Sequence, residues 1–326
     1  MVSDPGQQGR IVDDNPYTRE SHGLRGGVIP GSAGQPAFTL TRRDPSPIPV
    51  LVAVPHAGRL YPQGLIGQMR NPGEAVLRLE DRYVDLLGTA IARETGAALL
   101  VAHAPRAMID LNRAPDEMDW EMLRQGAPAG RRGQQVGRRA RSGLGLVPRR
   151  LAGLGELWRA RLEESELEAR LNGVHRPYHE AISQSLASLR GRWGAALLID
   201  LHSMPPLGSR GLGDPAPHIV LGDRFGATCD GALCAAAFDE FNQQRRLAAH
   251  NRPYAGGYVL ERHAAPERGI HAIQIEICRS TYLDRRLAEP VDAMAGMIAA
   301  LVALVRRLAT ETAILGRGAQ LPQAAE

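Results

Sequence analysis

Short apolar runs that predict buried strands alternate with longer stretches of helical periodicity, and this alternation constrains the fold more than any other feature of the sequence. Alternating strands and helices fold as a largely parallel sheet with helices on both faces. We therefore predict one α/β domain with a mostly parallel central sheet flanked by helices. The predicted strands are residues 50–54, 98–102, 107–111, 195–201, 218–221 and 271–277. The predicted helices are residues 74–95, 151–189, 226–244 and 289–312, the second of them broken near Asn172-Gly173 and Pro177.

The two ends of the chain and one long internal segment differ from this pattern. Residues 1–38 are rich in Gly, Pro, Asp and Gln and lack periodicity, so we expect a flexible N-terminal arm. The folded domain is expected over residues 39–315, followed by a flexible tail over residues 316–326. Residues 114–150 form a polar, Arg- and Gly-rich insertion, and a connection of this length inside a domain is typically functional or disordered.

The charge pattern bears on possible partners. The net charge is +4 and the pI is about 9.2, and the sequence contains no lysine, so every fixed side-chain cation is arginine. This excludes enzymes that depend on a Schiff-base lysine or a P-loop lysine. Residues 131–150 carry seven of the arginines and no acidic residue. The segment has almost no aromatic side chain on which the bases of a nucleic acid could stack. This composition favours a solvated loop over a nucleic-acid surface.

The cysteines and apolar stretches bear on location. Cys229, Cys234 and Cys278 are odd in number and not in a CxxC arrangement, which fits reduced thiols in a cytoplasmic protein. The first residues contain no signal-like apolar region, and the longest apolar stretch, residues 294–305, is shorter than a bilayer span. We therefore expect a cytoplasmic protein with a small-molecule partner and no membrane or nucleic-acid partner.

Polar residues of catalytic type stand at or near the ends of four predicted strands. The four groups are Pro55-His56-Ala57-Gly58, Asp110-Leu111-Asn112-Arg113, Asp200-Leu201-His202-Ser203 and Gln274-Ile275-Glu276-Ile277-Cys278-Arg279. The carboxyl ends of parallel strands meet at one edge of a sheet, where α/β proteins bind their ligands. These side chains are therefore expected to share one pocket.

The residue types in this pocket suit zinc chemistry. Two neutral imidazoles and a carboxylate form a catalytic zinc site with an open position, which His56, His202 and Asp81 would supply. A further carboxylate, Glu276, would act as general base and then as acid to the leaving amine. Arg113 would bind a substrate carboxylate or face an oxyanion.

Each of these residues also has a structural interpretation. His56 stands beside Pro and Gly and is consistent with a turn, while His202 follows a buried strand where any imidazole needs a partner. Asp81 is consistent with a helix-surface position, and Arg113 is suited to pair with a nearby aspartate. Glu276 lies inside an apolar strand, where a carboxylate is costly unless it is paired or functional. The coincidence of all five residues, rather than any one of them, indicates an active site.

The order of the motifs along the chain resembles a known family. These motifs are Pro55-His56-Ala57-Gly58, Glu80-Asp81-Arg82-Tyr83-Val84-Asp85, Ile109-Asp110-Leu111-Asn112-Arg113, Arg176-Pro177-Tyr178-His179, Asp200-Leu201-His202-Ser203-Met204, Gly256-Gly257 and the segment from Gln274 through Glu276 to Tyr282. Over about residues 48–300 the chain resembles the N-formylglutamate amidohydrolase (N-formylglutamate deformylase) family. That family is related in fold to zinc carboxypeptidases and to the succinylglutamate desuccinylase and aspartoacylase group.

The resemblance implies hydrolysis of N-formyl-L-glutamate to formate and glutamate by a phosphorylase/hydrolase-like α/β enzyme with one zinc ion. It implies His56, His202 and Asp81 as metal ligands, with Glu80 as the alternative third ligand. It further implies Glu276 as general base, Arg106 for carbonyl polarisation, and Asn112 and Arg113 for the substrate carboxylate. We also place Arg279 and His179 on the substrate side, although a hydrogen-bonded helix position is the alternative for His179.

Two departures from the family pattern limit what the resemblance implies. Ala57 stands where the family usually has serine, and residues 142–148 resemble a branch with a longer loop that need not share the formylglutamate substrate. The alternatives are therefore another N-acyl amino acid amidohydrolase or a carboxypeptidase-like zinc hydrolase. Outside enzymes, the alternatives are a metal-free binding protein on the same fold and a basic nucleic-acid-binding protein.

Overall fold

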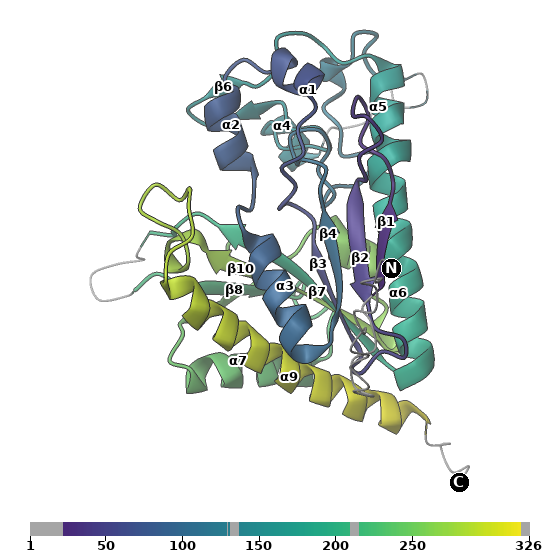
Figure 1. Cartoon of the computed structure of the whole chain (residues 1–326), viewed down its shortest axis with the longest axis vertical. Helices are drawn as coiled ribbons and strands as arrows, with labels where there is room; N and C mark the ends of the chain where they lie inside the picture. The colour runs from purple at the N-terminus through teal and green to yellow at the C-terminus, as the bar shows by residue number, and fades with distance from the viewer. Residues whose placement is uncertain (1–21, 129, 131–136, 209–214, 321–326) are drawn as a thin grey trace, which may run out of the picture.

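A single eight-stranded sheet forms the centre of the molecule in the computed structural model, which describes residues 22–128, 130, 137–208 and 215–320 (Figure 1). The strand order is β1-β2-β4-β3-β7-β10-β8-β9. The strands are β1 (His22–Gly26), β2 (Phe38–Arg42), β3 (Val50–Val54), β4 (Ala98–Ala102), β7 (Ala196–Met204), β8 (Ile219–Gly222), β9 (Ala248–His250) and β10 (Ile270–Cys278). The four central strands β4, β3, β7 and β10 run parallel, whereas β2 and β8 are antiparallel to their inner neighbours. The predicted α/β class with a mostly parallel sheet is confirmed.

Helices cover both faces of this sheet. The α-helices are α1 (Gln63–Gln68), α2 (Pro72–Leu79), α3 (Val84–Thr95), α4 (Arg138–Arg141), α5 (Glu164–Arg170), α6 (Arg176–Trp193), α7 (Gly231–Gln243), α8 (Tyr258–His263) and α9 (Ala293–Gln320). The described residues also form three 3-10 turns, a π-type turn and a short two-stranded ribbon. These are Trp120–Met122, Pro266–Arg268 and Arg279–Thr281, then Leu171–His175, and then β5 (Arg150–Leu151) with β6 (Gly155–Glu156).

The alternation of side chains along β3 shows how the two faces are filled. Leu51 and Ala53 point into a core that includes Tyr178 and Ile182 of α6. Val52, like its neighbours at positions 50 and 54, points into a second core formed with α3, α7 and α9. Successive strand residues face opposite sides, so an apolar run of this kind is stable only when both faces are covered. Figure 1 shows α3, α7 and α9 grouped on one side of the sheet and α6 along the other flank.

The last helix, α9, is long and apolar enough to cross a membrane by length and composition, with a mean hydropathy of 1.6 over residues 293–318. The sequence had suggested an apolar stretch too short for this. However, Met297, Leu301, Leu304 and Leu308 are buried in the core with α3 and α7. This packing is that of a core helix of a globular domain.

The helix predicted over residues 74–95 is in fact two helices. Between α2 and α3 the chain turns at Glu80 to Tyr83, and Tyr83 adopts a left-handed backbone conformation with φ of 60°. At this turn the backbone N–H of Asp81 donates to the carbonyl oxygen of His56 (2.9 Å). The turn therefore attaches Asp81 to the loop that follows β3, which the helical periodicity of the flanking residues does not reveal.

The strand predicted over residues 107–111 is wrong. This segment forms turns, in which the Met108 N–H donates to the Pro105 oxygen (2.9 Å) and the Asp110 N–H donates to the Leu146 oxygen (2.7 Å). Met108 and its apolar neighbours are buried in the core beside α6. An apolar run buried by the insertion looks, in sequence, like a strand buried in the sheet.

The helix predicted over residues 151–189 begins later, and near Asn172-Gly173 its regular α-helical geometry gives way to a π-type turn instead of a complete break. After the β5–β6 ribbon, α5 continues through a single π-type turn, Leu171–His175, directly into α6. Pro177 lies in the first turn of α6, where a missing N–H is tolerated. A π-type turn absorbs an additional residue without ending the helix.

The boundaries expected at the chain ends also require correction. Residues 22–26 form β1, which pairs with β2, and Ile29 is fully buried, so residues 22–38 belong to the folded domain rather than to an arm. The C-terminal helix continues to Gln320, so residues 316–320 are helical rather than part of a tail. The arm over residues 1–21 and the tail over residues 321–326 lie outside the described residues.

The Arg-rich insertion is folded onto the domain over the part that the structure describes. Met118, Met122, Leu146 and Val147 are buried in the core beside α6. Arg149 forms ion pairs with three acidic side chains, those of Asp119, Glu121 and Glu156, at 2.9 to 3.2 Å. The expectation of a solvated loop is therefore wrong for these residues, while Arg131 and Arg132 lie outside the described residues.

Candidate active site

His202 and Glu276 come together because β7 and β10 are adjacent parallel strands. In the register of this pair, His202 lies opposite Glu276, and Asp200 lies opposite Gln274. His202 lies within β7 rather than after its end, because the strand continues to Met204. Alternate residues of β7 and β10 therefore present polar side chains from two neighbouring strands to the same space.

His56 reaches this space from the loop that follows β3. Gly58, two residues further on, permits a close approach, because a Cβ at this position would lie 2.1 Å from the Ala104 oxygen. The loop after β3 can therefore pack directly against the loop after β4, where the imidazole of His56 is buried.

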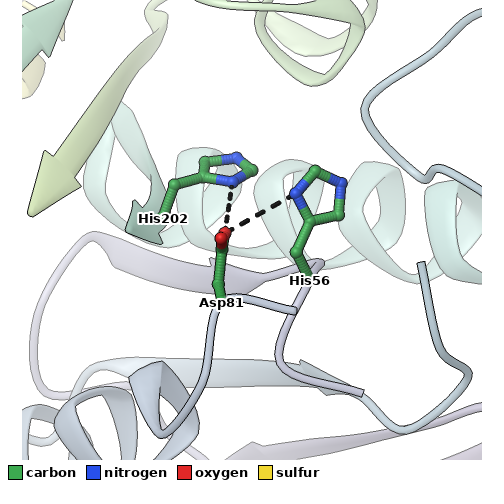
Figure 2. Close-up of side chains that lie close together, drawn as sticks. All are labelled: His56, Asp81 and His202. Atoms are coloured by element: carbon green, nitrogen blue, oxygen red, sulfur yellow. Dashed lines mark hydrogen bonds and ion pairs between the residues drawn. The ribbon is translucent and has the colours of Figure 1, made fainter. Parts of the chain in front are cut away.

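Asp81 lies between the two histidines, as Figure 2 shows. Its Oδ2 atom lies 3.0 Å from His202 Nδ1 and 3.6 Å from His56 Nδ1. One donor atom from each of the three buried residues lies within 4.8 Å of the others. The neighbouring Glu80 turns away, and its Oε2 pairs with Arg82 Nη1 at 3.0 Å. Of the two carboxylates considered from the sequence, the structure therefore places Asp81 beside the histidines.

The other nitrogen of each imidazole is held by a second aspartate. His56 Nε2 lies 2.7 Å from Asp110 Oδ1, and His202 Nε2 lies 2.9 Å from Asp200 Oδ2. Carboxylates in this position fix the tautomer and direction of histidines that bind a metal. With Nε2 so occupied, both Nδ1 atoms point toward Asp81.

Two arginines hold the aspartates in place. Arg106 donates to Asp110 Oδ2 from Nε (2.9 Å), with its Nη2 at the same distance from that oxygen. Arg279 donates from Nη2 to Asp81 Oδ1 (3.1 Å) and to the Glu80 carbonyl oxygen (2.6 Å). Each of these aspartates is therefore held from one side by a guanidinium and from the other by an imidazole.

The electrostatics of the cluster follow from these contacts. Burial acts to raise the pKa of Asp81, but the hydrogen bond with His202 and the nearby imidazole of His56 keep it well below its ordinary value. Burial acts to lower the pKa of His202, but the Asp200 and Asp81 carboxylates raise it well above its ordinary value. Asp81 is therefore an ionised carboxylate, which is the form that can bind a cation.

Glu276 behaves differently from the aspartates. Burial raises the pKa of its carboxyl group to about 7, against the opposing positive charges of His202 and Arg106. The carboxyl group receives a hydrogen bond from Gln274 Nε2 (2.9 Å). A carboxyl group that titrates near neutral pH is suited to accept and return a proton during a reaction.

Part of this network borders one cavity of about 320 Å³, whereas Asp110 and Asp200 lie behind the histidines, outside the cavity wall. This wall includes His56, Asp81, His202 and Glu276. Among the described residues, the charged side chains in the wall are six arginines and four carboxylates, namely Arg78, Arg106, Arg113, Arg139, Arg224, Arg279, Asp81, Glu117, Glu261 and Glu276. The excess of guanidinium groups favours an anionic ligand.

The family model for N-formylglutamate amidohydrolase matches residues 48–283. The chain belongs to this family. The N-formylglutamate deformylase of Pseudomonas aeruginosa is 30% identical over 278 residues, which cover 83% of this chain and 94% of the relative. The N-formylglutamate deformylase of Pseudomonas putida is 29% identical over 245 residues, which cover 73% of this chain and 82% of the relative.

Solved structures agree with this family membership. The crystal structure of N-formylglutamate amidohydrolase from Ralstonia eutropha JMP134 has a TM-score of 0.76 and 29% identity, covering 86% of this chain and 99% of that chain. A gene product from Agrobacterium tumefaciens has a TM-score of 0.61 at 18% identity, covering 84% of this chain and 95% of that chain, and shares the fold. The family that the sequence motifs suggested is confirmed.

In this member of the N-formylglutamate amidohydrolase family, only some of the residues that the sequence assigned to the substrate side border the cavity. Asn112, Arg113 and Arg279 border the cavity, whereas His179 does not; Arg106, which was assigned to carbonyl polarisation, also borders it. Arg279 is occupied by Asp81 and the backbone, which favours a positioning role over direct substrate contact.

Asn112 is also occupied within the protein. Its Oδ1 accepts from the Val259 N–H (2.9 Å), and its Nδ2 donates to Asp200 and Gln274 (3.3 Å each). Asn112 therefore links the loop after β4, the central strands and α8. Gly257 permits this link, because a Cβ there would lie 2.4 Å from Asn112 Oδ1.

His179 lies in a separate buried cluster behind the cavity. Its Nδ1 lies 2.9 Å from His263 Nε2, its ring lies 4.4 Å from that of His175, and its exposed fraction is 0%. The alternative of a hydrogen-bonded helix histidine, rather than a substrate contact, describes this position. Burial lowers the pKa of His179 well below its ordinary value, so the ring packs as a neutral group.

Asp110 and Asp200 were not singled out for a role by the sequence reasoning. Both stand inside motifs that had been noted, Asp110-Leu111-Asn112-Arg113 and Asp200-Leu201-His202-Ser203. The signal for Asp200 was its position two residues before His202 on a strand, since such residues face the same side of the sheet. Asp110 had no comparable signal. Its segment was expected to be a strand, and a strand does not predict the turns that place Asp110 beside His56.

The donor set fits a zinc ion. Among the described residues, His56 Nδ1 is a buried polar atom without a hydrogen-bond partner, although it faces Asp81. Two imidazoles and one carboxylate, with further carboxylates on the distal nitrogens, are typical of catalytic zinc sites. A cation beside His56 Nδ1, Asp81 and His202 would satisfy the orphaned nitrogen and the ionised carboxylate together.

A second group with metal-binding residue types, Asp223, Cys234 and His250, lies at the end of β8. Both carboxylate oxygens of Asp223 already accept hydrogen bonds. Asp223 Oδ1 accepts from Asn251 Nδ2 (2.7 Å) and from the Gly226 N–H (3.0 Å), and Asp223 Oδ2 accepts from the Cys234 thiol (3.2 Å). These contacts stabilise a turn, and the group does not border the cavity except through neighbouring residues.

Proposed function

We propose that this protein hydrolyses the amide bond of N-formyl-L-glutamate to give formate and L-glutamate, with a zinc ion held by His56, Asp81 and His202. The observation that carries the proposal is the convergence of these three donors with Glu276 on one cavity. Membership of the N-formylglutamate amidohydrolase family supports the same reaction, and the two Pseudomonas relatives are named for it.

Zinc, when bound, acts as a Lewis acid on a carbonyl oxygen and makes water more acidic. The protein's part is to hold the donors in the required direction. Asp110 and Asp200 hold the Nε2 atoms of His56 and His202, so both Nδ1 atoms remain directed at the site. Arg279 holds Asp81 by its other oxygen, which leaves Oδ2 toward the histidines.

Glu276 is the proposed proton carrier. In its ionised form the carboxylate accepts a proton from the attacking water as the C–O bond to the formyl carbon forms. It then returns the proton to the amide nitrogen as the C–N bond breaks, which releases formate and the free amine of glutamate. A pKa near 7 suits both transfers at neutral pH.

The arginines of the cavity supply the binding energy for the substrate anion. Arg113 is buried and pinned by two backbone oxygens, donating from Nη1 to the Asn112 oxygen (2.7 Å) and from Nε to the Leu144 oxygen (3.1 Å). Its position is therefore fixed before substrate arrives, and we assign it the α-carboxylate beside the scissile amide. Arg106 faces the same space and is placed to stabilise negative charge on the carbonyl oxygen.

The protein is also proposed to act in the cytoplasm on a free small molecule, without a nucleic-acid or membrane partner. Its three cysteines are buried free thiols, as expected in a reducing compartment. Subcellular fractionation of the native host checks the location.

The experiment for the proposed function is a substrate comparison with the purified, zinc-loaded protein. Release of amine is measured from N-formyl-, N-acetyl- and N-succinyl-L-glutamate at equal concentrations. We expect the highest kcat/KM for the formyl compound, because the chain belongs to the N-formylglutamate amidohydrolase family. Equal rates for the three compounds would remove the formyl assignment and favour a general N-acyl amino acid amidohydrolase. Activity on an unblocked dipeptide alone would favour a carboxypeptidase-like enzyme.

A further inference from the structure

One arginine of the cavity is not explained by the proposed centre. Arg139 lies on α4, the short helix of the insertion, and borders the same cavity as Glu276 and Arg113. Of the six cavity arginines, Arg106, Arg224 and Arg279 each pair with a carboxylate, and Arg78 and Arg113 donate to backbone oxygens. Within the described part of the chain, the guanidinium of Arg139 has no ion pair or hydrogen bond.

The surroundings of Arg139 are unfavourable for a cation. Partial burial lowers the pKa of its guanidinium, and the positive charges of Arg113 and Arg106 lower it further. Like charges that converge on one cavity repel each other, and a bound anion would relieve this repulsion. The arrangement therefore suits a ligand with more negative charge than Arg113 alone can neutralise.

The insertion is attached to the site firmly enough to place this side chain. The Leu144 oxygen accepts from Arg113 Nε (3.1 Å), and the Leu146 oxygen accepts from the Asp110 N–H (2.7 Å). Ala140, the residue after Arg139, is fully buried. Figure 1 shows α4 with α1 and α2 at one end of the molecule, beyond the ends of β3 and β4. The same segment therefore pins Arg113 and carries Arg139.

The residues that line the cavity differ in how deeply they are buried. Glu276 and Arg113 are both 8% exposed, whereas Arg139 is an exposed residue. A substrate whose acyl group lies at Glu276 and whose α-carboxylate lies at Arg113 therefore directs its side chain toward the mouth, where Arg139 stands. Guanidinium groups bind carboxylates through two parallel hydrogen bonds.

We propose that Arg139 of α4 forms a second carboxylate subsite at the mouth of the cavity and selects N-acyl amino acids with an acidic side chain. This inference rests on the proposed function for the position of the acyl group. It gives the Arg-rich insertion a role in specificity: the inner subsite at Arg113 binds any N-acyl amino acid, and the outer subsite at Arg139 distinguishes glutamate from its neutral isostere glutamine.

The test compares Arg139→Met, Arg139→Lys and Arg138→Met with the wild type, all zinc-loaded. Arg138 is the control, because it is exposed on the same helix but does not border the cavity. The readout is the ratio of kcat/KM for N-formyl-L-glutamate to that for N-formyl-L-glutamine. We expect the ratio to fall about 10-fold in Arg139→Met. This fold-change corresponds to the lower end of the free energies that hydrogen bonds to charged groups contribute. Arg139→Lys should retain part of the preference, and Arg138→Met should keep the wild-type ratio.

A binding measurement separates this inference from the proposed function. Dissociation constants of L-glutamate and L-glutamine, the products of any N-acyl substrate, are measured by calorimetry for the same proteins. Suppose that the wild type hydrolyses neither formyl compound, but that Arg139→Met weakens the binding of glutamate and not that of glutamine. The proposed function then fails and the subsite stands. If the wild type hydrolyses N-formyl-L-glutamate but neither the kinetic ratio nor the binding ratio changes in Arg139→Met, the subsite is overturned. An equal loss in Arg138→Met would also overturn it, since general charge would then explain the effect.

Discussion

His202 on β7 and Glu276 on β10 are register partners across two parallel strands, so an imidazole directed at Asp81 and a carboxyl group with a pKa of about 7 share one wall of the cavity. This relationship separates two tasks that both require buried polar groups. The histidine and Asp81 are suited to hold a cation, while Glu276 is suited to move a proton. The sheet fixes the distance between the two because both residues belong to central strands.

The first prediction concerns the proton carrier. Glu276→Gln keeps the shape and the Gln274 contact but removes the proton acceptor, so kcat should fall by about 10²- to 10⁴-fold. Zinc content, measured by plasma emission spectrometry on the same preparation, should equal that of the wild type. Loss of zinc in this variant would contradict the role given to Glu276 and make it a ligand instead.

The second prediction concerns the proposed ligand His202. His202→Ala removes a donor from β7, and the protein should lose its bound zinc together with its activity. His250→Ala is the matched control, because His250 is partly exposed and does not border the cavity. If His202→Ala kept a full equivalent of zinc after dialysis, His202 would not be a ligand.

The third prediction concerns the aspartates behind the histidines. Asp110→Asn and Asp200→Asn should each weaken zinc binding by about 10- to 100-fold, since they hold the Nε2 atoms of His56 and His202. Competition with a chromophoric chelator measures the affinity. Asp85→Asn is the control, because Asp85 pairs with Arg59 outside the cavity. Unchanged affinity in both variants would mean that the two aspartates serve only the fold.

The fourth prediction concerns pH and the buried histidines behind the cavity. Burial lowers the pKa of His175 to about 4 and that of His263 to about 3, from an ordinary value of 6.5. The unfolded chain therefore binds protons at a higher pH than the folded chain. The stability that these residues contribute is complete above pH 6.5 and is lost as the pH falls toward 4 and then 3.

Urea unfolding at pH 7 and pH 5 measures this effect. The free energy of unfolding of the wild type should fall between the two values of pH, and it should fall less in His263→Asn, which cannot take up the proton. Comparing the two proteins cancels the titration of the carboxylates that they share. An identical decrease in both proteins would show that His263 does not contribute to the acid sensitivity.

The sequence predicted the central sheet because its strands are buried on both faces, as β3, β7 and β10 are. Such strands are continuous apolar runs, which are distinct in sequence. It did not predict β1, β2 or β9, because these short strands at or next to the edges of the sheet have mixed composition. The segment over residues 107–111 was misassigned for the opposite reason, since loop residues buried by an insertion have the composition of a strand.

The candidate site was predictable where chemistry and position coincide on a strand. His202 and Glu276 are polar residues within apolar strands, and burial of such groups requires a partner or a function. Asp81 was harder, because its place depends on the turn between α2 and α3 that directs it toward His56. His179 was placed on the substrate side because of its motif, but the packing of α6 against α8 puts it behind the cavity.

The most direct test of the proposed zinc centre is anomalous diffraction at the zinc edge from crystals of the active, metal-loaded protein. The expected result is one strong anomalous peak in contact with His56, Asp81 and His202, with zinc content of about one equivalent per chain. An active crystal with no peak beside these three residues, or with its peak at a different set of ligands, would contradict the central claim.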